Sequence, residues 1–411
     1  MVFLCSRAVP FGGFLVTLAG GVAIARAAEQ QGARRGSGAS LAAMLQSVAI
    51  MGPARLGVPL TQALTAPLLG RMEAGRIGIF RQVLACGAIR LVQNTLGFLF
   101  FVGIITGLDA YATTYDNVVA ELVSLPQGVL PALAITAGGI VAWAVVASTI
   151  QVRVYRRGLR RWHGEDDGGA AVAAEEPEPD RRTAASSSHP GRTPSSSADA
   201  PQLGRFDPRL LAVAAVLAFG GLLASFSWPV LAAAVAWLVI AWAASARGVR
   251  GVLPAGLVFA TILGSGAFAF AAIGGLGLDV ALRRAARAAL LVLVATWLRA
   301  AAGSDGLREV ARRTLRRLRR VPAVDEATED LDELGATPRL AAAGRALLAS
   351  LGGVRRRPLP ILDAILVWVR REALRFRPVP AGAPVRLGVK ARDVALTALA
   401  LAPAVAAIAL G

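Results

Sequence analysis

Two adjoining stretches decide the fold: Ala288-Ala-Leu-Leu-Val-Leu-Val-Ala-Thr-Trp-Leu-Arg-Ala-Ala-Ala302 and Leu307-Arg-Glu-Val-Ala-Arg-Arg-Thr-Leu-Arg-Arg-Leu-Arg-Arg-Val321. The first is apolar enough to complete a membrane crossing. The second carries seven arginines and an apolar stripe at steps of three and four residues: Leu307, Val310, Thr314, Leu318 and Val321. Because a helix this basic leaves the bilayer on the cytoplasmic side, we expect it to lie in the cytoplasm, with its stripe against lipid, a neighbouring helix or a partner.

The composition of the whole chain agrees with a membrane protein. Its 411 residues are 55% hydrophobic and 17% charged, with a mean hydropathy of +0.58. We therefore predict an all-α polytopic membrane protein with roughly 8–9 transmembrane helices and a cytoplasmic helical coupling region before the last span. The net charge of +18 is almost entirely arginine, since Lys390 is the only lysine. Cytoplasmic loops that follow the positive-inside rule explain this charge better than nucleic-acid binding does.

The chain has few of the residues that most enzyme classes use for catalysis or metal binding. Cys5 and Cys86 are far apart, and His163 and His189 both lie in a polar segment. Two cysteines and two histidines at these positions do not fit a zinc, haem or iron–sulfur site, or a Ser–His–Asp catalytic triad. We expect a protein that is not an enzyme, with no catalytic or metal residues and no directly bound cofactor.

The amino-terminal part, residues 1–162, is predicted to be a membrane domain of unassigned role. Residues 2–28 fit a first membrane helix or a signal peptide, and we favour the helix because many spans follow. Residues 41–69, interrupted by prolines, fit a kinked, re-entrant or interfacial segment. Spans are expected at 83–108, with Arg90 snorkelling to the interface, and at 128–152.

The remaining chain divides by composition. Residues 163–205 are acidic and rich in serine and proline, so we predict a disordered cytoplasmic linker. A membrane bundle (206–303), cytoplasmic coupling helices (304–389) and a final transmembrane helix (390–411) follow. In the bundle, two apolar runs joined at Ser225-Phe-Ser-Trp-Pro229 predict a tight hairpin, and the glycine-rich run 253–278 allows close helix approach.

Three arginines conflict with this topology. Arg283, Arg284 and Arg287 precede the 288–302 run, and alternation of the spans puts them near the outside. The positive-inside rule disfavours arginine there. We interpret them as facing the bundle or snorkelling.

The order of these features in residues 205–411 resembles the transmembrane (T) component of energy-coupling factor transporters, bacterial importers of vitamins and metal ions. Asp207-Pro208-Arg209 stands before the first span, the hairpin follows, and a long helix runs into a cytoplasmic helical region before one last span. The resemblance implies a multi-pass protein of the bacterial cytoplasmic membrane. It also implies two ATPase subunits that use ATP, a separate substrate-binding membrane subunit, and no nucleic acid.

The resemblance also implies where the ATPases bind. The family usually has two Ala-Arg-Gly or Ala-Arg-Ser signatures in its coupling region, but Ala246-Arg247-Gly248 lies in the hairpin return. In the expected region, Gly344-Arg345-Ala346 is the nearest match. The implied ATPase contacts are Arg339, Arg345, Leu347 and Arg355, and the implied structural coupling helix contains Leu307, Val310 and Leu318.

Other functions remain open from the residues alone. A membrane scaffold could lay the arginine-rich helix on anionic lipid, at about 1 kcal/mol per basic residue. An enzyme acting on lipid-linked substrates would have to use Asp109, Asp116 and Glu121, which an ordinary solvated loop explains more simply. An ion-coupled carrier would want carboxylates deep in its spans, and we find none in the middle of a confident span.

Overall fold

The structure is a computed structural model. The described residues are 13–52, 59–120, 125–173, 206–245, 252–318, 320, 323–333, 346–347, 349, 351, 358–375 and 388–410. The described residues are about 90% helical and contain no strand, which confirms the all-α prediction.

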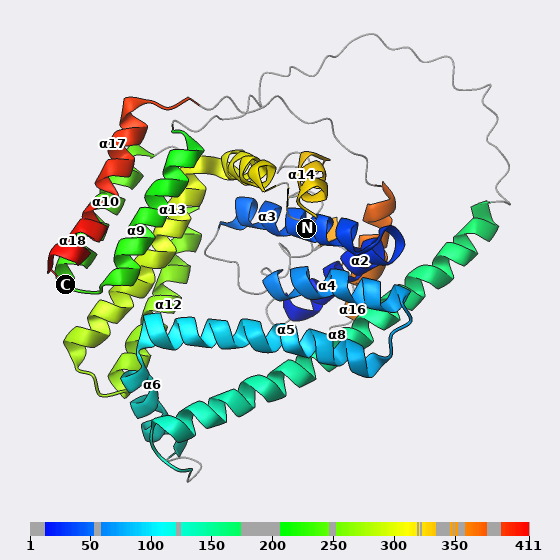
Figure 1. The fold of residues 1–411 in the computed structure, drawn as a ribbon, viewed down its shortest axis with the longest axis horizontal. Helices are drawn as coiled ribbons and strands as arrows, with labels where there is room; N and C mark the ends of the chain where they lie inside the picture. The colour runs from blue at the N-terminus through cyan, green and yellow to red at the C-terminus, as the bar shows by residue number, and fades with distance from the viewer. Residues whose placement is uncertain are drawn as a thin grey trace.

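Six helices of the carboxyl-terminal half lie side by side and form a bundle (Figure 1). They are α9 (Pro208–Ala224), α10 (Trp228–Ala244), α12 (Leu253–Ile273), α13 (Leu278–Arg317), α17 (Ala391–Leu399) and α18 (Ala402–Leu410). Only Ser225 to Ser227 separate α9 from α10, so the predicted hairpin is confirmed. The expected last span is broken between α17 and α18, where Pro403 lacks the N–H that a continuous helix would need.

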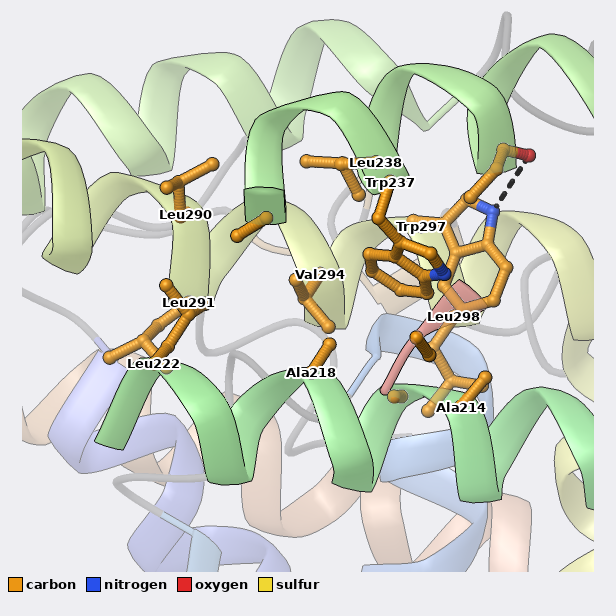
Figure 2. Close-up of a cluster of buried hydrophobic side chains, with 14 of the residues drawn as sticks. Ala214, Ala218, Leu222, Trp237, Leu238, Leu290, Leu291, Val294, Trp297 and Leu298 are labelled. Carbon is orange, nitrogen blue, oxygen red and sulfur yellow. Dashed lines mark hydrogen bonds between the residues drawn. The ribbon is translucent and has the colours of Figure 1, made fainter. Parts of the chain in front are cut away.

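The centre of the bundle is a pair of buried tryptophans (Figure 2). Trp237 of α10 and Trp297 of α13 meet edge to face, with ring centroids 5.0 Å apart. Each indole N–H donates to a backbone carbonyl, Trp297 Nε1 to Ala241 O at 3.0 Å and Trp237 Nε1 to Leu396 O at 3.3 Å. The pair therefore ties α13 to α10 and α17 through both packing and hydrogen bonds.

Five stretches of helix are long and apolar enough to cross a membrane, which indicates a multi-pass membrane protein. They are Ile79–Ile104, Val129–His163, Leu253–Ile273, Leu278–Arg317 and Ala391–Ala409. Two shorter apolar helices, α9 and α10, accompany them. These five are fewer than the roughly 8–9 spans that the sequence predicts. Two of the predicted spans are the 17-residue helices α9 and α10, and the helices near the amino terminus are not among the five candidates.

Those helices belong to a second body, which we call the helical layer. It consists of α2 (Gly13–Gln31), α3 (Ala33–Met51), α4 (Pro59–Ala74), α14 (Val324–Glu333), α16 (Pro358–Arg375) and the part of α13 after Gly303. Residues 13–28 of the expected first membrane helix lie in α2, which packs against α3, α4, α8 and α16 and is not one of the five candidates, and residues 2–12 of that helix lie outside the described residues. The proline-rich segment 41–69 falls on α3 and α4, also outside the candidates. The structure thus joins parts of two predicted domains, 1–162 and 304–389, in one layer.

Two long helices connect the layer to the far end of the bundle (Figure 1). They are α5 (Ile79–Phe100), continued by η2 (Phe101–Thr106), and α8 (Val129–Ala173), and they pack against each other. Between them α6 (Leu108–Thr114) and η3 (Tyr115–Ala120) touch α12, where Thr114 Oγ1 donates to Phe270 O at 2.9 Å. We call the end of the bundle beside α6 the outer end, after the orientation that the sequence predicts.

The predicted linker begins as helix rather than as coil. Helix α8 continues to Ala173, and His163 lies 3.3 Å from Glu29 of α2. Residues 174–205 of the predicted linker lie outside the described residues. The first residue of this segment, His163, therefore contacts the helical layer.

Candidate functional site

The junction between the bundle and the helical layer is the candidate functional site, and α13 passes through it. Gly303 has a φ of +69°, a conformation that suits glycine, and it kinks the helix between its bundle and layer parts. One turn later Gly306 lies directly against Pro208, where an added Cβ would come within 2.9 Å of Pro208 Cγ. The Asp-Pro-Arg sequence before α9 therefore packs on the kinked part of α13.

Asp207 fixes the start of α9 at this junction. Its buried side chain accepts from the Arg209 backbone N–H at 2.9 Å and from Arg209 Nε and Nη2 at 3.1 and 2.9 Å. These hydrogen bonds from Arg209 hold the pKa of the Asp207 carboxyl below its usual value. Asp207 is thus an ionised helix cap, with Pro208 at the first helical position.

Arg299 makes a second connection, from the end of the bundle part of α13 to α3. Its Nε donates to Ile50 O at 2.7 Å. The chain turns next at Gly52, whose φ is +89° and whose added Cβ would lie 3.1 Å from Arg299 Cβ. The carboxyl end of α3 is therefore seated on α13 by a charged donor and a close backbone approach.

The arginine-rich part of α13 contains one acidic residue, Glu309, and this residue is buried. Glu309 is 6% exposed and accepts from Arg312 Nε at 2.9 Å and from Arg313 Nε at 2.7 Å. The sequence signal for this pairing was present, because an acid followed by arginines three and four residues later is a helical ion-pair spacing. The predicted features of this segment were its arginines and apolar stripe, and Glu309 was not among them.

The apolar stripe of this helix is only partly used within the chain. Leu307 packs against the bundle core, Val310 is half-buried, and Leu318 is 48% exposed. The buried positions are instead Gly306, Glu309 and Leu315. The kink at Gly303 sets which face of the following helix meets the layer, and the sequence pattern alone does not show that rotation.

Helix α14 closes this side of the layer on α3. Arg35 forms ion pairs with Glu329 at 2.6 Å and Asp330 at 3.1 Å. An added Cβ on Gly38 would lie 2.5 Å from Glu326 Cβ, so the two helices touch through backbone and Cβ atoms. Beneath the ion pairs Ala42, Leu315, Val324, Ala327 and Leu331 form a small core shared by α3, α13 and α14.

On the other side, α16 closes on α2 and α8. Asp363 of α16 pairs with Arg161 at 2.6 Å and with Arg157 at 3.3 Å. Leu347 is fully buried there. It shares an apolar cluster with Leu18, Val22, Leu362, Ile365 and further residues. Of the predicted ATPase contacts, Leu347 is therefore a core residue of the layer, while Arg339, Arg345 and Arg355 lie outside the described residues.

A buried polar network joins α4, α5 and α8 beside the layer. Arg90 Nη2 donates to Gln151 Oε1 at 2.6 Å, and Gln151 Nε2 donates to Gln62 Oε1 at 2.8 Å and Thr65 Oγ1 at 2.6 Å. Arg90 is 5% exposed, so the expectation that it snorkels to the interface is wrong. The Gln151 amide oxygen gives this buried guanidinium an acceptor in place of water, and the sequence did not show that α8 brings Gln151 to it.

Metal-ligating residues and similarity to known proteins were also considered for this junction. Among the described residues, no group of three or more His, Cys, Asp or Glu side chains is placed to hold a metal ion. Comparison with protein-family models, with curated proteins and with solved structures found no match to this chain. The function must therefore be argued from the junction itself.

Proposed function

We propose that the chain is the transmembrane coupling subunit of an importer of the energy-coupling factor type. In this proposal it passes the motion of two ATPase subunits to a separate substrate-binding subunit in the bacterial cytoplasmic membrane, for uptake of a vitamin or a metal ion. The chain is not an enzyme and binds no cofactor itself, and ATP is used by its partners. The proposal rests on the resemblance of residues 205–411 and on the geometry of the junction.

The observation that carries the proposal is that one kinked helix, α13, takes part in both bodies. Its bundle part contains Trp297, at the centre of the core, and its layer part contains Leu315, which packs with residues of α3 and α14. Arg299 and Arg308 add hydrogen bonds to α3 and α14. A force on the layer therefore acts on α13, and packed helices move as units rather than deforming continuously.

The surface proposed for the ATPases lies beyond the junction. Arg339, Arg345 and Arg355 are proposed to give charge-assisted contacts to carboxylates of the ATPase subunits, with Leu347 supporting them from the core. The exposed end of α13, with Arg317 and Leu318, adjoins α14 and is proposed as the base of this surface.

Purification from native membranes tests the proposal. The full chain is expected to bring down ATPase subunits in native mass spectrometry, and the triple variant Arg339→Glu, Arg345→Glu and Arg355→Glu is expected to lose them. Arg81→Glu, an exposed arginine at the start of α5, is the matched control and should keep them. A wild-type chain that never carries an ATPase subunit would contradict the proposal.

A membrane scaffold is the alternative, and one observation favours it. The end of α13 exposes Leu318 beside Arg316, Arg317 and Arg320, which suits an anionic lipid surface as well as a protein. A scaffold predicts that Leu318→Asp weakens association with phosphatidylglycerol vesicles while no ATPase subunit co-purifies with the wild type. Loss of ATPase subunits in the same variant supports coupling instead.

A further inference from the structure

Three arginines at the outer end of the bundle form a cluster that the coupling role does not use. Near the start of α13, Arg283 and Arg284 are adjacent, and Arg287 follows them at spacings of four and three residues, which puts it on the same side of the helix as both. Their guanidinium carbons lie 5.8, 5.9 and 5.8 Å from the centroid of the Phe226 ring. We call these three residues the outer arginine cluster.

Three separate connections of the chain meet at this cluster. Phe226 lies in the turn between α9 and α10, and α13 itself begins after Gly277. Gly107, just before α6, lies so close that an added Cβ would be 2.5 Å from Arg284 Nη2. The guanidinium groups are thus enclosed by the outer turns of the bundle instead of extending freely from one helix.

The described partners leave part of the cluster unsatisfied. Arg283 forms an ion pair with Asp279, and Arg287 donates from Nη2 to Leu223 O at 3.0 Å. Arg283 Nε, Arg284 Nη1 and Arg287 Nε are buried with no hydrogen-bond partner. Arg287 is only 6% exposed, and among the described residues neither Arg284 nor Arg287 forms an ion pair.

Such an arrangement is unfavourable without a further anion. Like charges gathered near one ring repel each other, and the repulsion is strong where water is scarce. Contact with the face of Phe226 offsets part of this cost but leaves the buried N–H groups without acceptors. An oxyanion would supply both the missing charge and the missing acceptors, and guanidinium groups bind phosphate through paired hydrogen bonds.

The position of the cluster indicates where the anion comes from. Trp228 is 47% exposed beside it and donates from Nε1 to Asp279 Oδ1 at 2.7 Å. Tryptophans with one polar contact and one exposed face are typical of the membrane–water interface. Lipid phosphates lie at this depth, and dissolved phosphate reaches it from outside.

We propose that the outer arginine cluster binds a phosphate group at the predicted outer face of the membrane. The group belongs to the headgroup of a lipid or to a free phosphate ion, and both are recognised by the same guanidinium N–H donors. This site explains why three arginines occur at an end of the bundle where the positive-inside rule disfavours them. The proposal needs the membrane placement of the bundle but not the ATPase partners.

The full-length protein in nanodiscs tests the site. Arg284→Gln removes a guanidinium that makes no hydrogen bond to the described residues, so the fold should tolerate it. The matched control is Arg81→Gln. Arg81 is an exposed arginine near the start of α5, whereas the outer arginine cluster lies near the chain that follows the end of α5. Binding is measured by native mass spectrometry after transfer into phosphatidylcholine or phosphatidylglycerol discs, and by titration with inorganic phosphate.

We expect Arg284→Gln to lower phosphate-group binding about tenfold, as for the loss of one charge-assisted contact, while Arg81→Gln leaves it unchanged. Retention of phosphatidylglycerol that inorganic phosphate does not displace assigns the site to a lipid headgroup. Displacement by inorganic phosphate assigns it to a free anion. Equal binding of both probes by the wild type and Arg284→Gln, or a variant more thermally stable than the wild type in phosphatidylglycerol, would overturn the proposal.

Discussion

The close packing of α12 on α13 predicts that adding a methyl group at Gly256 destabilises the protein. Gly256 of α12 faces Thr296 of α13, and an added Cβ would lie 2.3 Å from Thr296 Cγ2 and 2.7 Å from Oγ1. Carbon atoms in ordinary contact are roughly 3.5–4.0 Å apart. Gly256→Ala must therefore push the two helices apart by about 1 Å or force Thr296 to move.

The packing cost of Gly256→Ala can be separated from the gain in helix propensity that alanine brings. Gly266 lies on the same helix, and an added Cβ there has no neighbour within 4 Å. Both substitutions gain the same helix propensity, about 1 kcal/mol, so their difference isolates the packing cost. Overpacking of a close contact costs about 1–3 kcal/mol, and we expect Gly256→Ala to be less stable than Gly266→Ala by that amount.

Reversible unfolding in mixed detergent micelles, followed by circular dichroism, measures the difference. A second variant makes the test specific. Thr296→Ala removes Cγ2 and Oγ1 but leaves Cβ, 2.9 Å from the added atom, so it should restore part of the stability of Gly256→Ala. Equal stability of Gly256→Ala and Gly266→Ala, or no recovery in the double variant, would refute the reasoning.

Three further predictions concern the junction and the buried network. Glu309→Gln should lower the free energy of unfolding by about 2 kcal/mol, measured in the same micelles, because two arginines lose a buried carboxylate. Gln151→Leu should cost about 3 kcal/mol, since three hydrogen bonds to Arg90, Gln62 and Thr65 are lost, and a neutral effect would contradict the network. Asp207→Asn should lower stability at neutral pH. Because the folded pKa of Asp207 is depressed, its contribution is present above the unfolded pKa and lost as the pH falls through the folded pKa, so wild type and variant should converge in acid thermal melts.

The secondary structure of the second half followed closely from local patterns. The hairpin of α9 and α10 was readable from two apolar runs and a Ser-Trp-Pro turn. These signals are local, since a helix boundary depends on the residues within one turn of it.

Local patterns failed where burial depended on distant residues. The sequence around α2 does not show that this helix packs on α16, more than 300 residues later in the chain. Arg90 was assigned to the interface because nothing near it in the sequence shows Gln151. The ATPase surface around Arg339, Arg345 and Arg355 stays a prediction.

By itself, the sequence determined that this is a helical membrane protein whose Leu307–Val321 segment leaves the bundle as a basic helix. Hydrophobic length and arginine content are properties of single segments, so they need no tertiary information. Only the tertiary structure decided that helices from both ends of the chain form one layer around that segment, and that Glu309 is its buried anchor. It also gathered Arg283, Arg284 and Arg287 on Phe226. Those contacts join turns and helices far apart in sequence, and their geometry depends on how the kink at Gly303 and the close helix packing orient each face.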